Sequence, residues 1–102
     1  MTNKTALVTG ASDGIGLEFC KILAAKGYDL ILVARRKAVL NKLAKALSQQ
    51  YHNINCTVIS TDLSKPQGAQ KLFATTVKKD LHVDLLINNA GLLQNGFFTD
   101  ID

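Results

Sequence analysis

The sequence predicts an α/β domain built on an open, doubly wound parallel sheet, and three observations carry this prediction. Short apolar runs alternate with stretches of helical periodicity in the order β-α-β-α-β-α-β. One run, Leu30-Ile31-Leu32-Val33, is continuously apolar, as expected of a strand that is buried on both faces. A glycine-rich turn, Thr9-Gly10-Ala11-Ser12-Asp13-Gly14-Ile15-Gly16, joins the first run directly to the first helical pattern. Right-handed crossovers then place the strands in the spatial order 3-2-1-4.

In the first half of the chain, strands are predicted at about 5–9 and 30–33, and a helix at about 14–26. The apolar face of this helix is predicted to consist of Ile15, Phe19, Ile22 and Leu23. Gly27 is well placed to end the helix, because glycine adopts the left-handed cap conformation easily. A second helix is indicated by the spacing of Leu40, Leu43, Leu47 and Tyr51.

In the second half, strands are predicted at 57–60 and 84–88, with a helix between them. Ser64 is the expected cap of this helix, and Pro66 falls in its first turn. Its buried stripe is predicted to be Leu72, Phe73 and Val77. The first two helices should cover one face of the sheet and the third helix the other. The last strand is then an edge, and apolar surface left uncovered beside the third helix predicts self-association or a homo-oligomer.

Composition narrows the class of protein. A chain of 102 residues with 47% hydrophobic residues is one globular domain rather than a disordered segment. No apolar stretch approaches the roughly 18 residues of a membrane span. The amino terminus runs directly into the first strand without a signal-peptide pattern, so we expect a cytoplasmic protein that does not bind membranes.

The charge pattern and the spacing of the cysteines and histidines argue against a nucleic-acid-binding protein and against a metal-binding protein. The net charge is +4, but aromatic residues make up only 6% and do not alternate with the basic run, so nucleic acid is not an expected partner. Cys20, Cys56, His52 and His82 have no ligand-like spacing, and no metal site is predicted. The two cysteines are expected to pack as reduced thiols.

The glycine-rich turn predicts an anion site. A strand that turns directly into a helix leaves the first backbone N–H groups of that helix pointing at the turn. Gly10 would allow the tight turn, Gly14 the close approach of a phosphate, and Gly16 the packing of helix on strand. The alternative is a strand-helix turn of the same composition that binds no ligand.

Three later segments fall where a dinucleotide site needs them. Arg35 and Arg36 follow the second strand, at the place where an acidic residue would accept hydrogen bonds from the adenosine ribose. Guanidinium groups there favour the 2′-phosphate of NADP, or they are a basic helix start exposed to water. Asp62-Leu63 follows the third strand and is suited to the amine and ring of adenine, or is an ordinary turn. Asn88-Asn89-Ala90-Gly91 ends the fourth strand, where ligands of such sheets bind.

Together these motifs resemble the cofactor half of the short-chain dehydrogenase/reductase family, from Lys4 to about Phe98. The resemblance implies a Rossmann fold in which Gly10, Ser12, Asp13, Gly14, Ile15 and Gly16 form the pyrophosphate loop. It implies that Arg35, with Arg36, binds the 2′-phosphate, that Asp62 and Leu63 hold adenine, and that Asn88, Ala90 and Gly91 flank the nicotinamide ribose. Asp13 stands where NADP-preferring relatives often have a basic residue, which leaves the two arginines as the evident phosphate ligands.

The family's catalytic Tyr-x-x-x-Lys pair is absent from these residues. Tyr28 is followed four residues later by Leu32, and Tyr51 by Asn55. The resemblance therefore implies that residues 1–102 are the amino-terminal, NADP(H)-binding portion of a longer, truncated oxidoreductase fold, with NAD(H) the less favoured cofactor and no activity of their own. The parent would transfer hydride between nicotinamide and a small carbonyl or secondary alcohol. The alternatives are an inactive nucleotide-binding or redox-sensing module and a protein-interaction fragment.

Overall fold

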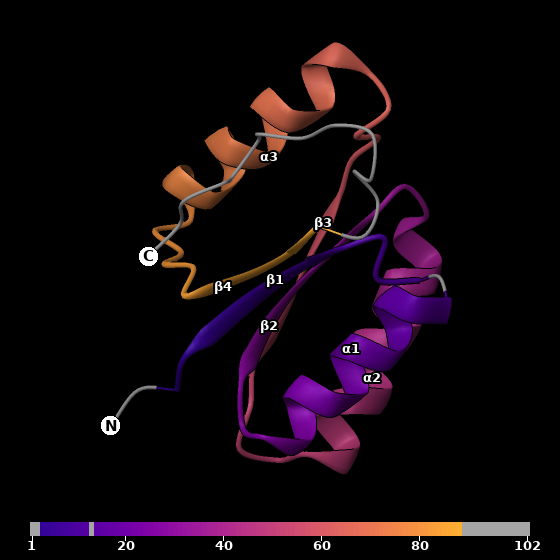
Figure 1. The fold of residues 1–102 in the computed structure, drawn as a ribbon, viewed down its shortest axis with the longest axis vertical. Helices are drawn as coiled ribbons and strands as arrows, with labels where there is room; N and C mark the ends of the chain where they lie inside the picture. Colours follow the sequence, from indigo (N-terminus) through magenta and orange to yellow (C-terminus); the bar gives the residue numbers. More distant parts are fainter. Residues whose placement is uncertain (1–2, 13, 89–102) are drawn as a thin grey trace.

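The computed structural model describes residues 3–12 and 14–88, which form a parallel sheet with helices on both faces (Figure 1). The elements in chain order are β1 (Thr5–Thr9), α1 (Gly14–Ala25), β2 (Asp29–Ala34), α2 (Lys37–Gln50), β3 (Cys56–Ser60), α3 (Pro66–Lys78) and β4 (Leu85–Asn88). The strand order is β3-β2-β1-β4, so the predicted fold class and topology are confirmed.

Two apolar clusters, one on each face, hold the layers together. Helices α1 and α2 lie on one face of the sheet and α3 on the opposite face (Figure 1). Alternate residues of each central strand point to opposite clusters, so Leu7 and Ile31 pack toward α3 whereas Val8 and Leu32 pack toward α1 and α2. Both central strands are therefore buried on both faces, which explains the continuous apolar run of β2.

Helix α1 ends just before Gly27, the glycine that was predicted to terminate it. Gly27 has a φ of 86°, in the left-handed region, and its N–H donates to the carbonyl of Ala24. The N–H of Tyr28 reaches back to the carbonyl of Leu23, which completes a Schellman cap. This cap turns the chain directly into β2.

The predicted apolar face of α1 is wrong in most of its members. Ile15 is 67% exposed and Ile22 is 50% exposed, and of the predicted set only Leu23 is buried. The side chains that meet the sheet are smaller and lie on the neighbouring face, at Gly16, Cys20, Leu23 and Ala24. A helix lies close to a sheet where small residues face it, and this packing advantage outweighed the size of the apolar side chains.

The predicted buried stripe of α3 is also partly wrong. Leu72 is fully buried, but Phe73 is 59% exposed and Val77 is 63% exposed. In addition, β4 forms one edge of the described sheet, and all four of its residues are only partly buried. Apolar surface is therefore exposed on both helical layers, and self-association through it stays a prediction.

Asp84 joins the start of β4 to the start of β1. Its carboxylate accepts a hydrogen bond of 2.8 Å from the N–H of Thr5, and its own N–H donates to the carbonyl of Thr5 at 2.8 Å. His82 Nε2 lies 3.0 Å from the other carboxylate oxygen. The Thr5 hydrogen bond is the main cause that lowers the pKa of Asp84 below its usual value of 3.8.

Because this pKa is lower in the folded than in the unfolded chain, the stabilisation from Asp84 is present above about pH 4 and is lost as the pH falls through the folded-state value. Asp84→Asn keeps an acceptor for Thr5 but does not titrate, so we expect it to reduce the loss of stability in acid. Urea unfolding at pH 7 and at pH 3 measures this difference. Asp80→Asn at an exposed position is the matched control, and an equal acid sensitivity of all three proteins would contradict the role of Asp84.

Among the described residues, no helix combines the length and the apolar character needed to cross a membrane.

Candidate functional site

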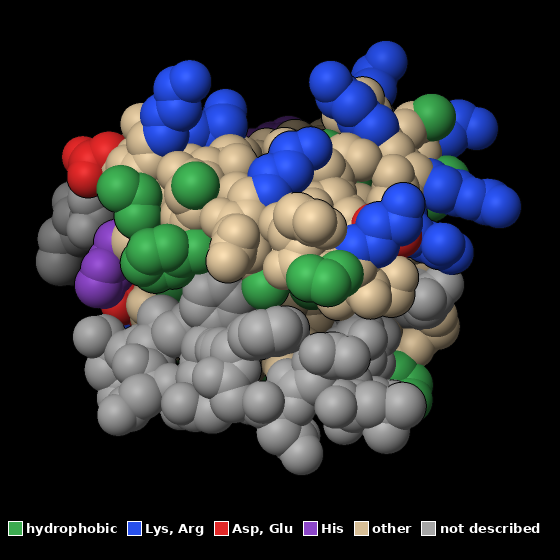
Figure 2. All heavy atoms as spheres, turned by 90° about the horizontal axis from the view of Figure 1, so that it is seen from above, with side chains coloured by type: hydrophobic (Ala, Val, Ile, Leu, Met, Phe, Trp, Pro, Cys, Tyr) green, Lys and Arg blue, Asp and Glu red, His purple; other side chains and the backbone are tan. Residues whose placement is uncertain are grey.

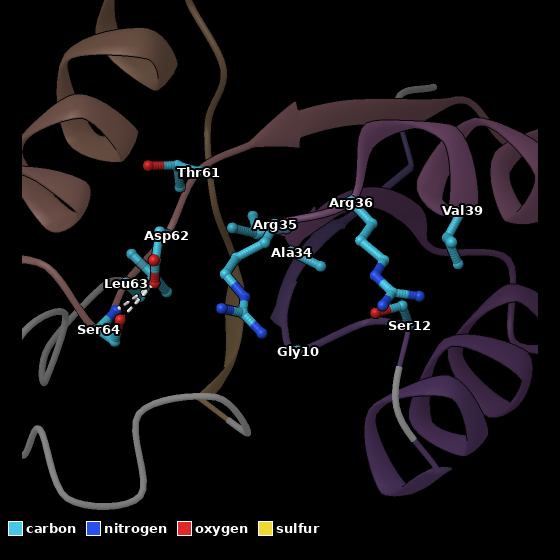
Figure 3. A pocket seen from close by; sticks show the side chains of 11 residues that line it. Gly10, Ser12, Ala34, Arg35, Arg36, Val39, Thr61, Asp62, Leu63 and Ser64 are labelled. Atoms are coloured by element: carbon cyan, nitrogen blue, oxygen red, sulfur yellow. Dashed lines mark hydrogen bonds between the residues drawn. The ribbon is translucent and has the colours of Figure 1, made fainter.

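A cavity of about 570 Å³ opens at the carboxyl ends of the strands, between the glycine-rich turn and the segments that leave β2 and β3 (Figure 3). Its volume is in the usual range of small-molecule sites. The residues around it are Gly10, Ser12, Val33, Ala34, Arg35, Arg36, Val39, Thr61, Asp62, Leu63 and Ser64. The cavity therefore lies where open α/β sheets bind their ligands.

The turn after β1 has the geometry that the glycine pattern predicts. Gly10 has a φ of 63°, which a residue with a side chain rarely adopts. The N–H of Ala11 donates to the carbonyl of Val33 at 3.2 Å, which ties the turn to the end of β2. A Cβ added at Gly14 would meet no atom within 4 Å, so space is open at the start of α1. The first turn of α1 contains no acidic residue, although Asp13 precedes it in the sequence, and the N–H groups and dipole of a helix N-terminus attract an anion.

Two arginines follow β2 and reach into the cavity. In Figure 3 the Arg35 side chain extends between the Gly10 turn and the segment from Asp62 to Ser64, and the Arg36 guanidinium points toward Ser12. The backbone at Arg35 is held by β3, because the Ser60 hydroxyl donates to the Arg35 carbonyl at 2.8 Å. Two guanidinium groups that line the same cavity are suited to a dianionic phosphate.

Asp62 and Leu63 form another part of the cavity wall, at the end of the segment that leaves β3. Oδ1 of Asp62 accepts hydrogen bonds from the Ser64 N–H at 2.9 Å and the Ser64 hydroxyl at 2.6 Å (Figure 3). These bonds, with a smaller contribution from the charge of Arg35, lower the pKa of Asp62 below its usual value. The carboxylate is therefore ionised at neutral pH and can accept a hydrogen bond from a ligand amine through Oδ2.

Ser64 is not the cap that the sequence predicted for α3. Lys65 occupies the N-cap position and Pro66 is the first helical residue, while the Ser64 hydroxyl is engaged by Asp62. The predicted position of Pro66 is confirmed. The acidic residue two positions earlier competes for the serine hydroxyl, and this local turn is the reason for the difference.

Asn88 lies at the end of β4 and contacts β1 rather than the cavity lining. The Thr9 hydroxyl lies 3.2 Å from Oδ1 of Asn88 and 3.4 Å from the carbonyl of Ile87. Thr9 is buried, so these acceptors satisfy its hydroxyl between the two strands. The Asn88 side chain is thereby oriented beside the glycine turn.

The structure gathers six of the predicted site residues around the cavity, which are Gly10, Ser12, Arg35, Arg36, Asp62 and Leu63. Gly14 and Ile15 line a second, apolar hollow on the outer side of α1 with Glu18, Phe19 and Ile22. Gly16 is buried where α1 packs on the sheet. Asp13, Ala90 and Gly91 lie outside the described residues.

Sequence reasoning did not assign five of the lining residues to the site, which are Val33, Ala34, Val39, Thr61 and Ser64. Thr61 could have been predicted to line the site, because it directly follows β3 and precedes Asp62. Val39 comes from the first turn of α2 and carried no signal, since one exposed valine in a helix has no distinctive pattern.

Positively charged side chains predominate over acidic ones on the described part of one end of the molecule (Figure 2). Lys and Arg side chains project from much of the end of the molecule that is uppermost in Figure 1, and few acidic side chains are visible there (Figure 2). The long-range field of such a surface attracts negatively charged ligands.

Neither cysteine belongs to the cavity lining. Both thiols are free, and burial raises the pKa of Cys20 to about 12, so this thiol stays protonated. Among residues 3–12 and 14–88, no group of three potential ligands could hold a metal ion.

The comparison with protein families decides the identity of this fold. A family model described as short chain dehydrogenase matches residues 4–102. The chain belongs to this family. Its members are oxidoreductases, and the resemblance read from the glycine turn and the later motifs is confirmed.

Individual relatives agree with the family assignment. The chain is 40% identical over 101 residues to the uncharacterized oxidoreductase YmfI of Bacillus subtilis, a match that covers 98% of this chain and 40% of that protein. L-sorbose reductase from Gluconobacter frateurii, solved with NADPH and L-sorbose, superimposes with a TM-score of 0.80 and 30% identity over 89% of this chain and 34% of that one. A short-chain dehydrogenase from Sphingobium yanoikuyae in complex with NADPH gives a TM-score of 0.77 with 36% identity, covering 86% and 34%. The chain thus spans two fifths or less of the length of these relatives.

Proposed function

We propose that the chain is the NADP(H)-binding portion of a short-chain oxidoreductase that transfers hydride between nicotinamide and a carbonyl or secondary alcohol. The observation that carries the proposal is the cavity at the carboxyl ends of β1, β2 and β3, which Arg35, Arg36 and Asp62 line together. NADPH-bound relatives of similar fold support the choice of cofactor. In this proposal residues 1–102 form one cofactor-binding unit of a longer enzyme.

The adenosine end of the cofactor would bind in the cavity. Arg35 and Arg36 would hold the 2′-phosphate, because no acidic side chain stands directly after β2 to repel it. Asp62 would accept a hydrogen bond from the exocyclic amine of adenine, and Leu63 would pack beside the ring. NAD(H) lacks the 2′-phosphate and would lose the arginine contacts.

The pyrophosphate would lie at the glycine turn and the first turn of α1. The groups assigned to it are Gly10, Ser12, Asp13, Gly14, Ile15 and Gly16. Backbone N–H groups at the start of α1 supply hydrogen-bond donors to the phosphates, so no positively charged side chain has to be buried there. The open space at the Cβ position of Gly14 supports close approach of a phosphate there.

The nicotinamide end would lie beyond β4, beside Asn88, Ala90 and Gly91. When bound, nicotinamide supplies the hydride donor or acceptor. Thr9 would keep the end of β4 in register with the glycine turn, through the Asn88 and Ile87 acceptors.

Proton transfer to the substrate oxygen needs an acid whose pKa is lowered by a nearby cation. The family supplies this acid with a Tyr-x-x-x-Lys pair, and residues 1–102 lack that pair. Reduction of a substrate is therefore proposed for the longer enzyme alone. We also propose a reducing compartment such as the cytoplasm, because Cys20 and Cys56 are both free thiols.

Calorimetric titration of the chain with NADPH and with NADH tests the proposal. We expect binding of NADPH and weaker binding of NADH, since only NADPH carries the group that the arginines recognise. Absence of binding by both dinucleotides would contradict the function and favour a protein-interaction role. Tighter binding of NADH would contradict the assignment of the arginines.

A further inference from the structure

The first turn of α3 rests directly on the backbone of the cavity wall. Gly68 is buried in this turn. A Cβ added there would overlap the Asp62 carbonyl oxygen, lie 2.7 Å from the carbonyl carbon of Asp62 and lie 3.1 Å from the Cα of Leu63. A Cβ added at Gly14 or at Gly27 would meet no atom within 4 Å. Of these three glycines, only Gly68 lies against the backbone of a predicted ligand-binding segment.

Hydrogen bonds join the same two pieces of backbone. The Thr61 hydroxyl donates to the carbonyl of Gly68 at 3.4 Å, and the Lys65 N–H donates to the carbonyl of Asp62 at 3.2 Å. Thr61 is 7% exposed, and its N–H pairs with the carbonyl of Ala34 at 3.0 Å. The segment from Thr61 to Leu63 is therefore held between the end of β2 and the first turn of α3.

The helix is the more firmly anchored of the two partners. Leu72 is fully buried in the cluster between α3 and the sheet, and Ala69 is 9% exposed. The wall segment, in contrast, ends in the exposed Ser64 at the cavity rim. A side chain at position 68 would consequently displace the backbone of Asp62 and Leu63 more easily than it would displace α3.

We propose that Gly68 is a positioning residue for adenine recognition, which sets where Asp62 and Leu63 stand in the cavity. This proposal rests on the proposed function, because it assigns adenine to that wall. Gly68 itself does not line the cavity. Its effect on the ligand passes through the Asp62 backbone, so the substitution should alter recognition of adenine more than recognition of the 2′-phosphate.

The test compares Gly68→Ala with the wild-type chain in titrations with NADPH, NADH and the hypoxanthine analogue of NADPH, which has an oxygen in place of the exocyclic amine. We expect the wild type to prefer NADPH over the analogue by about tenfold, the lower end for a hydrogen bond to a charged group. Gly68→Ala should bind NADPH about tenfold more weakly and lose most of this preference, while its preference for NADPH over NADH is retained. A variant that is merely less stable would keep both ratios.

Thr61→Val is the second variant, and it tests the role of Gly68 in adenine recognition if Gly68→Ala does not fold. It removes the hydroxyl that bonds the Gly68 carbonyl but keeps the size and branching of the side chain. We expect it to reduce the NADPH-to-analogue ratio by about threefold, in line with the loss of one neutral hydrogen bond. Gln70→Ala, at an exposed position of α3, is the control and should leave all ratios unchanged.

The outcomes separate the two proposals. A wild-type chain that binds none of the dinucleotides overturns the proposed function and the role of Gly68 with it. A wild-type chain that prefers NADPH over NADH but does not distinguish the analogue overturns the contact of Asp62 with the adenine amine and the role of Gly68 with it, while NADP(H) binding stands. The role of Gly68 alone is overturned if folded Gly68→Ala, or Thr61→Val in its place, keeps the wild-type NADPH-to-analogue ratio.

Discussion

Leu7→Ala is expected to lower the free energy of unfolding by about 2–5 kcal/mol, the range for truncating a fully buried leucine. Leu7 is 0% exposed at the centre of β1, where it packs with Ile31, Val33 and Leu72. The surrounding side chains belong to a sheet and an anchored helix, so they cannot collapse into the space. Since domains of this size are stable by only about 5–15 kcal/mol, the loss is a large part of the total. Urea unfolding followed by circular dichroism measures it.

Val77→Ala is the matched control for this experiment. Val77 is 63% exposed on α3, so its truncation should change stability by no more than about 0.5 kcal/mol. Leu7→Met retains the volume of the core and should cost less than about 1.5 kcal/mol, which keeps the test informative if the alanine variant does not fold. A Leu7→Ala chain as stable as the Val77→Ala chain would contradict the two-sided burial of β1.

Replacing both Arg35 and Arg36 by alanine is expected to abolish the preference for NADPH over NADH. A hydrogen bond to a charged group is worth about 1.5–3 kcal/mol, and because both arginines are exposed we take the lower end, about tenfold for each. NADPH affinity should fall by about 100-fold on this basis, while NADH affinity should change little. Calorimetric titration of the single and double variants with both dinucleotides measures the effect.

Lys37→Ala is the control for the loss of positive charge. Lys37 is exposed in the first turn of α2, directly beside the arginines, but does not line the cavity. Its substitution should weaken both dinucleotides slightly and equally, through the general field alone. If Lys37→Ala removed the NADPH preference as fully as the double arginine variant, specific recognition of the 2′-phosphate by Arg35 and Arg36 would be wrong.

The sheet was predictable because its signals are local and redundant. The apolar run of β2 is typical of a strand buried on both faces, and the glycine turn predicted the passage from β1 into α1. The faces of the helices were less predictable. Ile15 and Phe73 have the size and spacing of core residues, yet the sheet is met by the small residues of α1 and by Leu72 of α3. A periodic pattern identifies a helix but does not say which of two adjacent apolar faces packs inward.

The candidate site was predictable where residues follow strand ends, since parallel strands bring these positions to one edge. Arg35 and Asp62, far apart in the sequence, line the same cavity for this reason. The contact of Gly68 with the Asp62 backbone could not be read from the sequence. Glycine in a helix has several explanations, and only the crossing of α3 over the wall segment selects among them.

The central claim is that the cavity binds the adenosine end of NADP(H), and a backbone amide NMR titration with adenosine 2′,5′-bisphosphate tests it most directly. We predict saturable shifts of the Gly10, Ser12, Arg35 and Asp62 amides, which surround the cavity, and little change in the turn from His52 to Asn55, which precedes β3 at the opposite end of the strands. Adenosine 5′-monophosphate should give the same pattern at much higher concentration. Shifts confined to Phe19 and Ile22 on the outer side of α1, or no saturable shifts at all, would contradict the claim.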